Sequence, residues 1–191
     1  MSRSNRERSE TTRQALVEAA RTLFVEKGYA ETATPDIVAA AGMTRGALYH
    51  HFEDKKALFR AVIEREARAV AAAIEEGAEP ARSAREGLLA GASAYFDAMS
   101  VEGRTRLLLL DGPAVLGPDD LGAIDRENAE ATLRAGLAAF LSEAGKSDDL
   151  LDPLTVLLSA AFDRAALAIR AGGDREDYER AIAMLLDGLD A

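Results

Sequence analysis

The chain has 191 residues, of which 48% are hydrophobic and 29% are charged, an ordinary balance for a globular protein. It contains no cysteine, which excludes disulfides, thiolate metal sites and cysteine nucleophiles. No apolar run approaches the roughly 18 residues that cross a bilayer, and the first residues lack the apolar stretch of a secretory signal, so we expect a cytoplasmic protein with no membrane partner.

The charge is unevenly distributed along the chain. The formal net charge is −10, which by itself argues against nucleic acid as a partner, because phosphate contacts need Lys and Arg. Residues 1–70, however, hold 12 Lys and Arg against 10 Asp and Glu, a net of +2, whereas residues 71–191 hold 11 against 23, a net of −12. A mildly basic N-terminal segment followed by an acidic remainder suits a protein that contacts DNA through its N-terminal segment alone.

Helical patterns dominate the first third of the chain. Apolar residues recur at the spacing of one helix face at Leu16, Ala19, Ala20, Leu23 and Phe24. A second helix is predicted to start at Thr34-Pro35, with Thr34 as N-cap, and to stop at Gly42. A third, short helix is expected from about Thr44 to His51, and Asp54 is expected to cap a fourth helix that begins at Lys55.

The rest of the chain is also predicted to be helical, after a turn at Gly77, Glu79 and Pro80. Helices are expected over about 81–99, 103–110, 119–144, 152–171 and 174–189, with Asp111-Gly112-Pro113 interrupting the second of these. The fold class is therefore all-α. We expect a DNA-binding domain over residues 1–54 and a helical domain over residues 55–191.

Two short helices joined by Gly42-Met43 and surrounded by apolar helices have the layout of a helix-turn-helix, whose second helix enters the major groove. Gly42 suits the tight turn because glycine adopts a positive φ without steric strain. If Ala47 and Leu48 face the core, the side chains that face outward are Thr44, Arg45, Gly46, Tyr49 and His50. Such side chains reach base edges and phosphates.

The residues themselves make this motif more specific. The run Gly28-Tyr29, Thr32, Thr34, 37–52 (IVAAAGMTRGALYHHF), Lys55 and Leu58-Phe59 closely resembles the DNA-binding domain of regulators of the tetracycline-repressor (TetR) family. The resemblance covers about residues 11–60. One departure is Val38, where many members carry Ala.

The resemblance implies a role for each matching residue. Thr44, Arg45 and Gly46 would open the recognition helix, with Arg45 contacting a base, because Arg to guanine is the commonest specific pairing. Contacts to phosphate or a base are implied for Tyr49 and His50, and contacts to phosphate for Thr34 and Lys55 at helix N-termini. The alternative for Tyr49 is packing across the domain. The basic residues Arg3, Arg6, Arg8 and Arg13 form either a DNA-binding arm or a frayed terminus.

The same resemblance implies a C-terminal domain that dimerises and senses a small ligand. The large apolar residues Tyr95, Phe96, Met99, Leu110, Phe140 and Phe162 either line a pocket or fill the core. Asp163, in an apolar helix beside Arg164, either orients a ligand or belongs to a solvated or interfacial pair. The identity of the ligand does not follow from these residues.

The last two helices are candidates for a dimer interface. Small and apolar residues share one helix face, which allows close helix approach, and they are Leu154, Leu158, Ala161, Ala165 and Ala168, joined by Leu185 and Leu189. Burial within one subunit is the alternative. We favour the interface because helix-turn-helix proteins usually read two half-sites as dimers.

Catalysis is not expected. The histidines are His50 and His51, both in the recognition helix, and the sequence has no glycine-rich phosphate loop, clustered metal ligands or cofactor motif. We predict a sequence-specific transcriptional regulator, with no cofactor or metal, that is a repressor released from a palindromic operator by a small ligand. Repression is carried over from the family. The alternatives are an effector-independent or protein-partner-controlled DNA-binding dimer, and an interaction module whose helix-turn-helix is vestigial.

Overall fold

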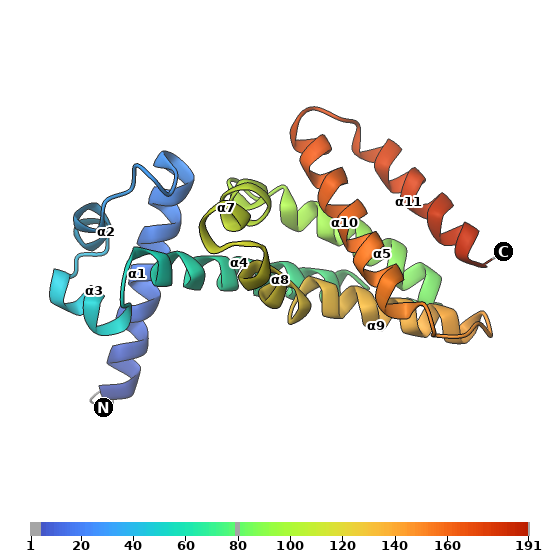
Figure 1. The fold of residues 1–191 in the computed structure, drawn as a ribbon, viewed down its shortest axis with the longest axis horizontal. Helices are drawn as coiled ribbons and strands as arrows, with labels where there is room; N and C mark the ends of the chain where they lie inside the picture. Colours follow the sequence, from blue (N-terminus) through green and yellow to red (C-terminus); the bar gives the residue numbers. More distant parts are fainter. Residues whose placement is uncertain (1–4, 79–80, 191) are drawn as a thin grey trace. The chain divides into compact units, whose positions relative to one another are not determined.

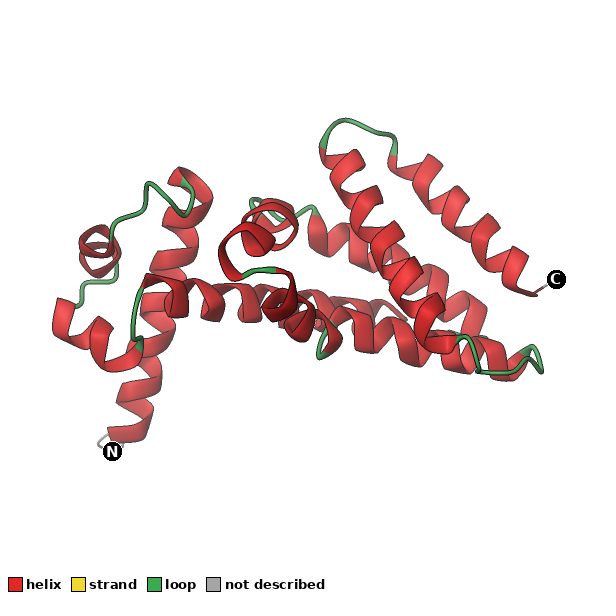
Figure 2. Cartoon of the chain, in the orientation of Figure 1, coloured by secondary structure: helices red, strands yellow, loops and turns green. Residues whose placement is uncertain are grey.

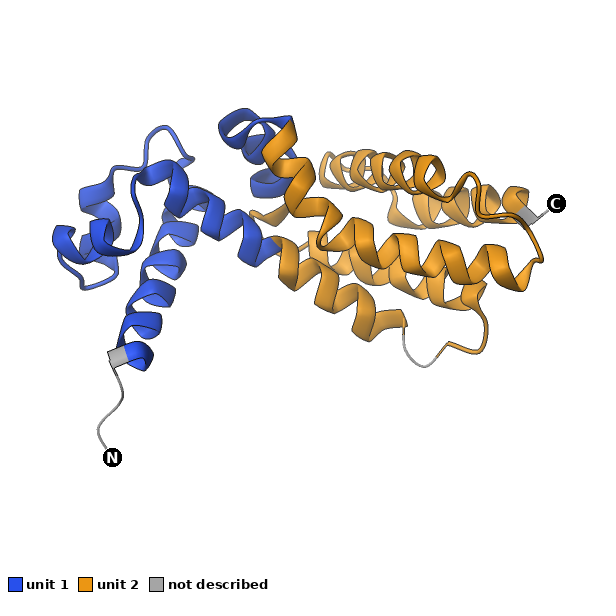
Figure 3. Cartoon of the chain, turned by 60° about the horizontal axis from the view of Figure 1, so that its bottom comes forward, with its two compact units in different colours: residues 1–66, 106–118 blue, residues 67–105, 119–191 orange. Residues whose placement is uncertain are grey.

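The computed structural model describes residues 5–78 and 81–190, and all regular secondary structure in these two ranges is helical (Figure 2). The predicted all-α fold is confirmed. The chain divides into two compact units, residues 1–66 with 106–118 and residues 67–105 with 119–191 (Figure 3). The turn predicted at Glu79 and Pro80 lies outside the described residues.

The first unit contains α1 (Asn5–Lys27), α2 (Thr34–Ala40), α3 (Arg45–His51) and the beginning of α4 (Lys55–Ala78) (Figure 1). The sequence predicts that one apolar face of α1 is buried, and the structure confirms it, because the residues of that face pack against those of the neighbouring helices. The core consists of Leu16, Ala20, Phe24, Ile37, Leu48, Leu58, Phe59 and Val62. A small, fully packed core holds α2 and α3 in a fixed mutual orientation.

The turn between α2 and α3 has the predicted form. Gly42 has φ +64°, and the next amide, of Met43, donates a hydrogen bond of 2.9 Å to the carbonyl of Val38. Thr44 then caps α3, since its hydroxyl accepts from the amide of Ala47 at 3.1 Å. Glycine at the positive φ and a threonine cap together end one helix and start the next, with four residues between them.

The starts of α2 and α4 test two predicted caps. Asp54 Oδ1 accepts a hydrogen bond of 2.7 Å from the amide of Ala57, which confirms Asp54 as the cap of α4. The prediction of Thr34 as N-cap is wrong by one position, because Thr34 is already helical and the extended Ala33 precedes it without a side-chain cap. Pro35 at the helix start supplies a preset φ, so α2 begins without a capping side chain.

The segment around Pro113 is continuous, so the interruption predicted at Asp111-Gly112-Pro113 is wrong. The short α6 (Arg104–Arg106) runs into a π-helical turn, η1 (Leu107–Asp111), and then into α7 (Gly112–Leu116). The amide of Gly112 donates to the carbonyl of Leu107, five residues earlier. Proline lacks an amide hydrogen and its ring crowds the carbonyl four residues before it. The wider π turn accommodates the proline where a regular α-helix would break.

The second unit contains the remainder of α4, α5 (Ala84–Met99), α8 (Pro118–Arg126), α9 (Ala129–Glu143), α10 (Leu151–Arg170) and α11 (Arg175–Asp190). Helix α5 packs against α9, α10 and α11. Its buried residues meet those of the surrounding helices in a core of Leu88, Ala92, Tyr95, Phe96, Leu137, Phe140, Leu141, Leu158, Ile182 and Leu186.

The single long helix predicted over 119–144 is wrong, because the chain breaks between α8 and α9 at Glu127 and Asn128. Asn128 closes α8, with its backbone amide donating to the carbonyl of Asp125 at 2.9 Å and its side-chain amide donating to the carbonyl of Ile124 at 2.6 Å. Asparagine competes for backbone groups in this way and so favours helix ends. The break places Asp125 in the last turn of α8.

The compact units differ from the domains expected at 1–54 and 55–191. They divide α4 between Glu66 and Ala67, and they group residues 106–118 with the N-terminal segment. Within the first unit, the buried Glu66 pairs with Arg21 of α1 at 2.9 Å, which links the middle of α4 to α1. Gly28 lies against the 106–118 segment, since a Cβ there would lie 2.8 Å from the guanidinium of Arg106.

Candidate functional site

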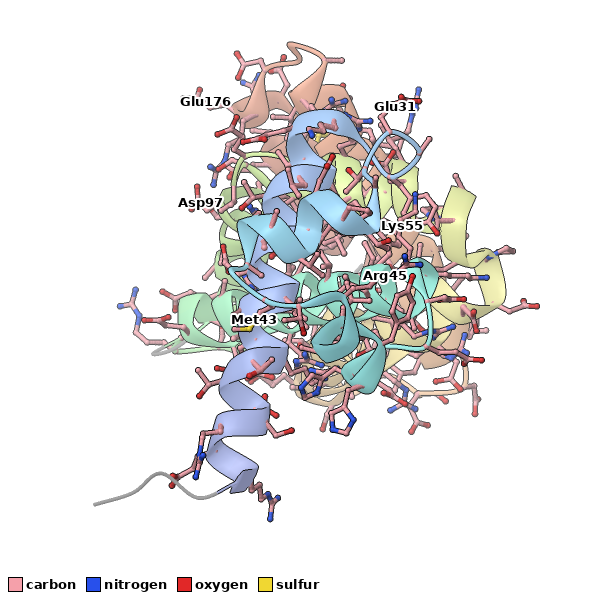
Figure 4. All side chains as sticks on the ribbon, turned by 90° about the vertical axis from the view of Figure 1, so that its left-hand side faces the viewer. Glu31, Met43, Arg45, Lys55, Asp97 and Glu176 are labelled. Atoms are coloured by element: carbon pink, nitrogen blue, oxygen red, sulfur yellow. The ribbon has the colours of Figure 1, made fainter. Side chains whose placement is uncertain are left out.

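The outer face of α3 carries the side chains that the sequence assigned to DNA. Leu48 is completely buried, whereas Thr44, Arg45, Gly46, Tyr49 and His50 are exposed. Figure 4 looks onto this end of the first unit, with Met43 at the turn and Arg45 and Lys55 labelled. A helix anchored by one buried leucine therefore presents a polar face that is free to enter a groove.

Tyr49 connects the exposed face of α3 to the start of α2. The guanidinium carbon of Arg45 lies 5.4 Å from the centre of the Tyr49 ring. Hydrogen bonds with Thr34 and then with Arg45 lower the pKa of the Tyr49 phenol. The structure thus brings three of the predicted residues together, two from the recognition helix and one from the helix before it.

Lys55 has a different environment from the one that the sequence suggested. Its ammonium donates hydrogen bonds to the backbone carbonyls of Tyr29 at 2.8 Å and of Thr32 at 3.0 Å, and lies 4.3 Å from the centre of the Tyr29 ring. The side chain therefore braces the loop between α1 and α2. The neighbouring Lys56, which sequence reasoning did not single out, is exposed.

The basic residues of the N-terminal segment are not an extended arm in the part of it that the structure describes. Arg6, Arg8 and Arg13 belong to α1, and Arg13 stacks over the ring of Phe52 at 5.2 Å. Arg3 lies outside the described residues. Helical placement fixes the direction of these cations on one rigid element.

The second unit contains a cavity of about 500 Å³ that is partly open to solvent. Of the predicted pocket residues, Tyr95, Phe162 and Asp163 line it. Phe96, Met99 and Phe140 are buried but do not line it, and Leu110 belongs to the first unit, where its side chain is 44% exposed. The remaining lining is mostly small or apolar, from α4, α5 and α9, and includes Ile74, Ala78, Gly87, Leu88, Gly91, Ala92, Ala129, Leu133, Gly136 and Ala139.

Two carboxylates from different helices reach the cavity wall. Asp163 of α10 accepts a hydrogen bond of 2.8 Å from the phenol of Tyr95, and Asp125 of α8 accepts one of 3.4 Å from the hydroxyl of Ser159. Burial raises the pKa of Asp163. Burial, with repulsion from Asp163 and then Glu130, raises the pKa of Asp125 to about 6. Such shifts mark carboxylates that water solvates poorly.

Sequence reasoning missed Asp125 and Ser159. Both lie within predicted helices, and no sequence motif around either residue indicates a ligand site. The two residues meet because the chain breaks after Arg126 and because α10 lies beside α8 at this point. The hydrogen bond between Ser159 and Asp125 joins the two helices. Tertiary proximity of this kind leaves no trace in the spacing of residues along the chain.

The predicted interface residues fall on two sides of their helices. On α10, Leu158 and Ala165 are buried within the chain, whereas Leu154, Ala161 and Ala168 are half-buried. On α11, Leu185 is 53% exposed and Leu189 is half-buried. The apolar side chains left most open to solvent are instead Leu157, at 67%, and Met184, at 75%, with Val156 beside the first.

Within the part of the chain that the structure describes, no helix is long and apolar enough to cross a membrane. Over the same residues, no group of three or more His, Asp and Glu side chains is placed to hold a metal ion.

Comparison with known proteins identifies both halves of the chain. Residues 16–62 match the model of the bacterial regulatory proteins of the tetR family, and residues 85–189 match that of the tetracyclin repressor-like C-terminal domain. The probable HTH-type transcriptional regulator ArpR of Pseudomonas putida is 30% identical over 180 residues, which cover 90% of this chain and 80% of ArpR.

Two more proteins extend the comparison. The crystal structure of a TetR-family transcriptional regulator from Pectobacterium atrosepticum superposes with a TM-score of 0.74 at 30% identity, covering 98% of this chain and 95% of that one. The HTH-type transcriptional repressor BepR of Brucella suis is 43% identical over 65 residues, 34% of this chain and 31% of BepR. Several other curated relatives are likewise matched over less than a third of their length.

These matches agree with the exposed polar face of α3 and with the cavity of the second unit described above. They confirm the resemblance seen in the sequence, and they confirm that the chain is not an enzyme, because the family consists of transcriptional regulators. The chain belongs to the TetR family of DNA-binding, HTH-type transcriptional regulators.

Proposed function

We propose that the protein is a repressor that binds a palindromic operator as a homodimer and is released by a small organic ligand. The observation that carries this proposal is the outer face of α3, where Arg45 and Tyr49 are exposed and packed against each other. Leu48 points the opposite way, into the core. A guanidinium held in this way suits bidentate contact with guanine in the major groove. Repression accords with the relative BepR of Brucella suis, which is a transcriptional repressor.

The DNA contacts are assigned to Thr34, Thr44, Arg45, Gly46, Tyr49, His50 and Lys55. Arg45 reads a base. Tyr49 and His50 contact phosphate or a base edge, and Thr34 offers a phosphate contact at the start of α2. Gly46 leaves the helix surface free of a side chain, so the DNA backbone can approach closely. For Lys55, whose ammonium is bonded to the carbonyls of Tyr29 and Thr32, we assign the phosphate contact to the backbone amides of the first turn of α4.

The dimer would form through α10 and α11. Val156 and Leu157 on α10, and Met184 and Leu185 on α11, expose large apolar side chains that gain stability when they are covered. Half-buried small residues beside them, such as Ala161 and Ala168, allow two helices to approach closely. A twofold dimer would hold two recognition helices roughly 34–36 Å apart, one turn of DNA, and would read a palindrome in the cytoplasm.

The ligand would occupy the cavity of the second unit, lined by Tyr95, Phe162 and Asp163. A mostly apolar cavity of about 500 Å³ with a few polar groups is typical of sites for small organic molecules. A ligand that binds more tightly to a conformation with a different spacing of recognition helices lowers operator affinity by that differential free energy, typically about 1–3 kcal/mol.

Selection of DNA from a random pool tests the proposal. The wild-type protein and the Arg45→Ala/Tyr49→Ala double variant would be used in parallel at low and moderate salt. The wild type should enrich a palindrome and the double variant should not. If neither enriches any sequence, and binding is absent even at low salt, the proposal is wrong and the protein acts through its second unit.

The selected operator then tests ligand release. Organic compounds that bind the folded state raise the melting temperature of the free protein. If such a compound is the effector, it should also lower the affinity of the protein for the operator. If compounds bind the cavity and operator affinity stays unchanged, the dimer is independent of an effector or is controlled by a protein partner.

A further inference from the structure

The cavity of the second unit contains negative charge without a matching positive charge. Asp125 and Asp163 reach it from α8 and α10, and their hydrogen-bond partners are the neutral hydroxyls of Ser159 and Tyr95. No Lys or Arg among the described residues forms a salt bridge with either carboxylate. Of the other charged side chains on the wall, Glu75 and Glu143 are acidic, and Arg82 pairs with Glu86 outside the cavity lining.

This arrangement is unfavourable in the free protein. Carboxylates taken out of water lose solvation free energy unless a cation or several hydrogen bonds replace the water. The pKa of both groups is raised, first by burial, which shows that their charged forms are poorly stabilised. The groups that act on Asp125 are Asp163 and Glu130, which repel it, and Ser159 and Arg126, which stabilise its charge only in part.

The rest of the wall is suited to an apolar body. Aliphatic side chains from three helices, such as Ile74, Leu88 and Leu133, face the cavity. Two aromatic rings, of Tyr95 and Phe162, lie beside the carboxylates with centroids 5.7 Å apart. Aromatic faces attract organic cations as well as burying hydrocarbon. The cavity thus combines anionic groups, aromatic rings and aliphatic surface.

We infer that the effector is an organic cation with an apolar, partly aromatic body, whose charge is held by Asp125 and Asp163. This inference rests on the proposed function, in which the cavity takes the effector. The cation supplies the charge that the two carboxylates lack, and the aliphatic and aromatic wall covers the remainder of the ligand. A neutral or anionic ligand of the same shape would leave both carboxylates uncompensated.

Tetraphenylphosphonium and tetraphenylborate provide the test, because they have nearly the same shape and opposite charge. Calorimetric titration at pH 7.5, without DNA, should show that the wild type binds the phosphonium about ten-fold or more tightly than the borate. The Asp125→Asn/Asp163→Asn variant should lose roughly ten-fold or more in phosphonium affinity, the range of a charge-assisted contact. Borate affinity should stay unchanged or rise.

The matched control is Asp119→Asn/Asp149→Asn, which removes the same charge from exposed positions and should bind both ions as the wild type does. Lowering the pH to 5 protonates Asp125, whose pKa is about 6, and should weaken phosphonium binding in the wild type but not in the cavity variant. Thermal melts of all variants verify folding.

Three results would overturn the inference: equal or tighter binding of the borate, an unchanged phosphonium affinity in the cavity variant, or no binding of either ion. Operator binding by the same preparation separates this failure from that of the proposed function. A wild type that binds its operator and is released by a neutral compound remains a ligand-controlled repressor with another ligand class. A wild type that binds no operator is not a repressor, whichever ion the cavity prefers.

Discussion

The guanidinium of Arg45 lies over the ring of Tyr49, four residues later on α3, with its carbon 5.4 Å from the ring centre. Residues four apart share one face of a helix, so the ring supports the guanidinium from the side of the helix C-terminus. Both side chains are exposed, and the phenol also interacts with Thr34 at the start of α2. The guanidinium that we propose to contact a base is thus oriented before DNA arrives.

Arg45→Ala should lower operator affinity by roughly 1–3 kcal/mol and relax base preference at one position of each half-site, because a bidentate contact is lost. Arg45→Lys should recover only part of the affinity, since an ammonium lacks the planar pair of donors. Fluorescence anisotropy with labelled operator at fixed salt measures both. The control Arg180→Ala, an exposed arginine of α11, should bind as the wild type; an equal loss in both variants would contradict the assignment.

Lys55→Met should reduce the free energy of unfolding by roughly 1–3 kcal/mol, because charge-assisted hydrogen bonds to the carbonyls of Tyr29 and Thr32 disappear. Lys56→Met, one residue later and exposed, should leave stability within about 0.5 kcal/mol of the wild type. Urea unfolding provides the comparison. A stable Lys55→Met protein with a reduced salt dependence of operator binding would instead make Lys55 a direct phosphate contact.

Asp125→Asn should change how stability depends on pH. The folded pKa of Asp125, about 6, exceeds the ordinary 3.8, so the carboxyl stabilises the fold when protonated and this contribution is lost as the pH rises through 6. Asparagine cannot ionise. The stability of the variant relative to the wild type should therefore increase by roughly 2–3 kcal/mol between pH 4 and pH 7.

Urea unfolding at intervals from pH 4 to pH 8 measures this difference in stability. The control is Asp119→Asn, at an exposed position, for which the difference from the wild type should not change with pH. A pH-independent difference for Asp125→Asn would show that the carboxyl titrates normally in the folded protein. Asp163, whose pKa is also raised by burial, remains in both proteins and cancels to first order.

Leu157→Asp and Met184→Asp should each convert the dimer into monomers, since a carboxylate would be buried without a partner in the proposed interface. Sedimentation equilibrium measures the mass directly. Val101→Asp, which changes another exposed apolar residue of the second unit, should leave the dimer intact. Dimerisation of both interface variants at wild-type strength would place the interface on another surface.

The helix-turn-helix was predictable because its signals are local. Gly42 with positive φ, the cap at Thr44 and the cap at Asp54 each act within four residues, so the sequence contains them directly. The break at Asn128 was not predictable, because it depends on a side-chain amide that competes for a backbone carbonyl. The π turn before Pro113 was not predictable either, because it depends on how the folded helix accommodates a proline ring.

The packing faces of α10 were harder to predict than its existence. The helix is rich in Leu and Ala on every side, so periodicity alone does not select which stripe faces α5 and α9. Leu158 and Ala165 face the chain's own core, while Leu157 remains exposed one position away. One residue of α-helix corresponds to about 100° of rotation, which is enough to exchange an internal face for an external one.

The π turn of Leu107–Asp111 has a consequence for any insertion or deletion in this stretch. A π-helical hydrogen bond spans one residue more than an α-helical bond, as the bond from Gly112 to Leu107 shows. Removing one residue from the turn would restore α-helical winding, which would press the ring of Pro113 against the carbonyl four residues before it and break the helix there. Removing one residue from α7 itself would instead rotate everything after it by about 100° and shift it by about 1.5 Å. The proline and the π turn therefore fix the length of this segment together, and a change of one residue at either place alters the course of the chain.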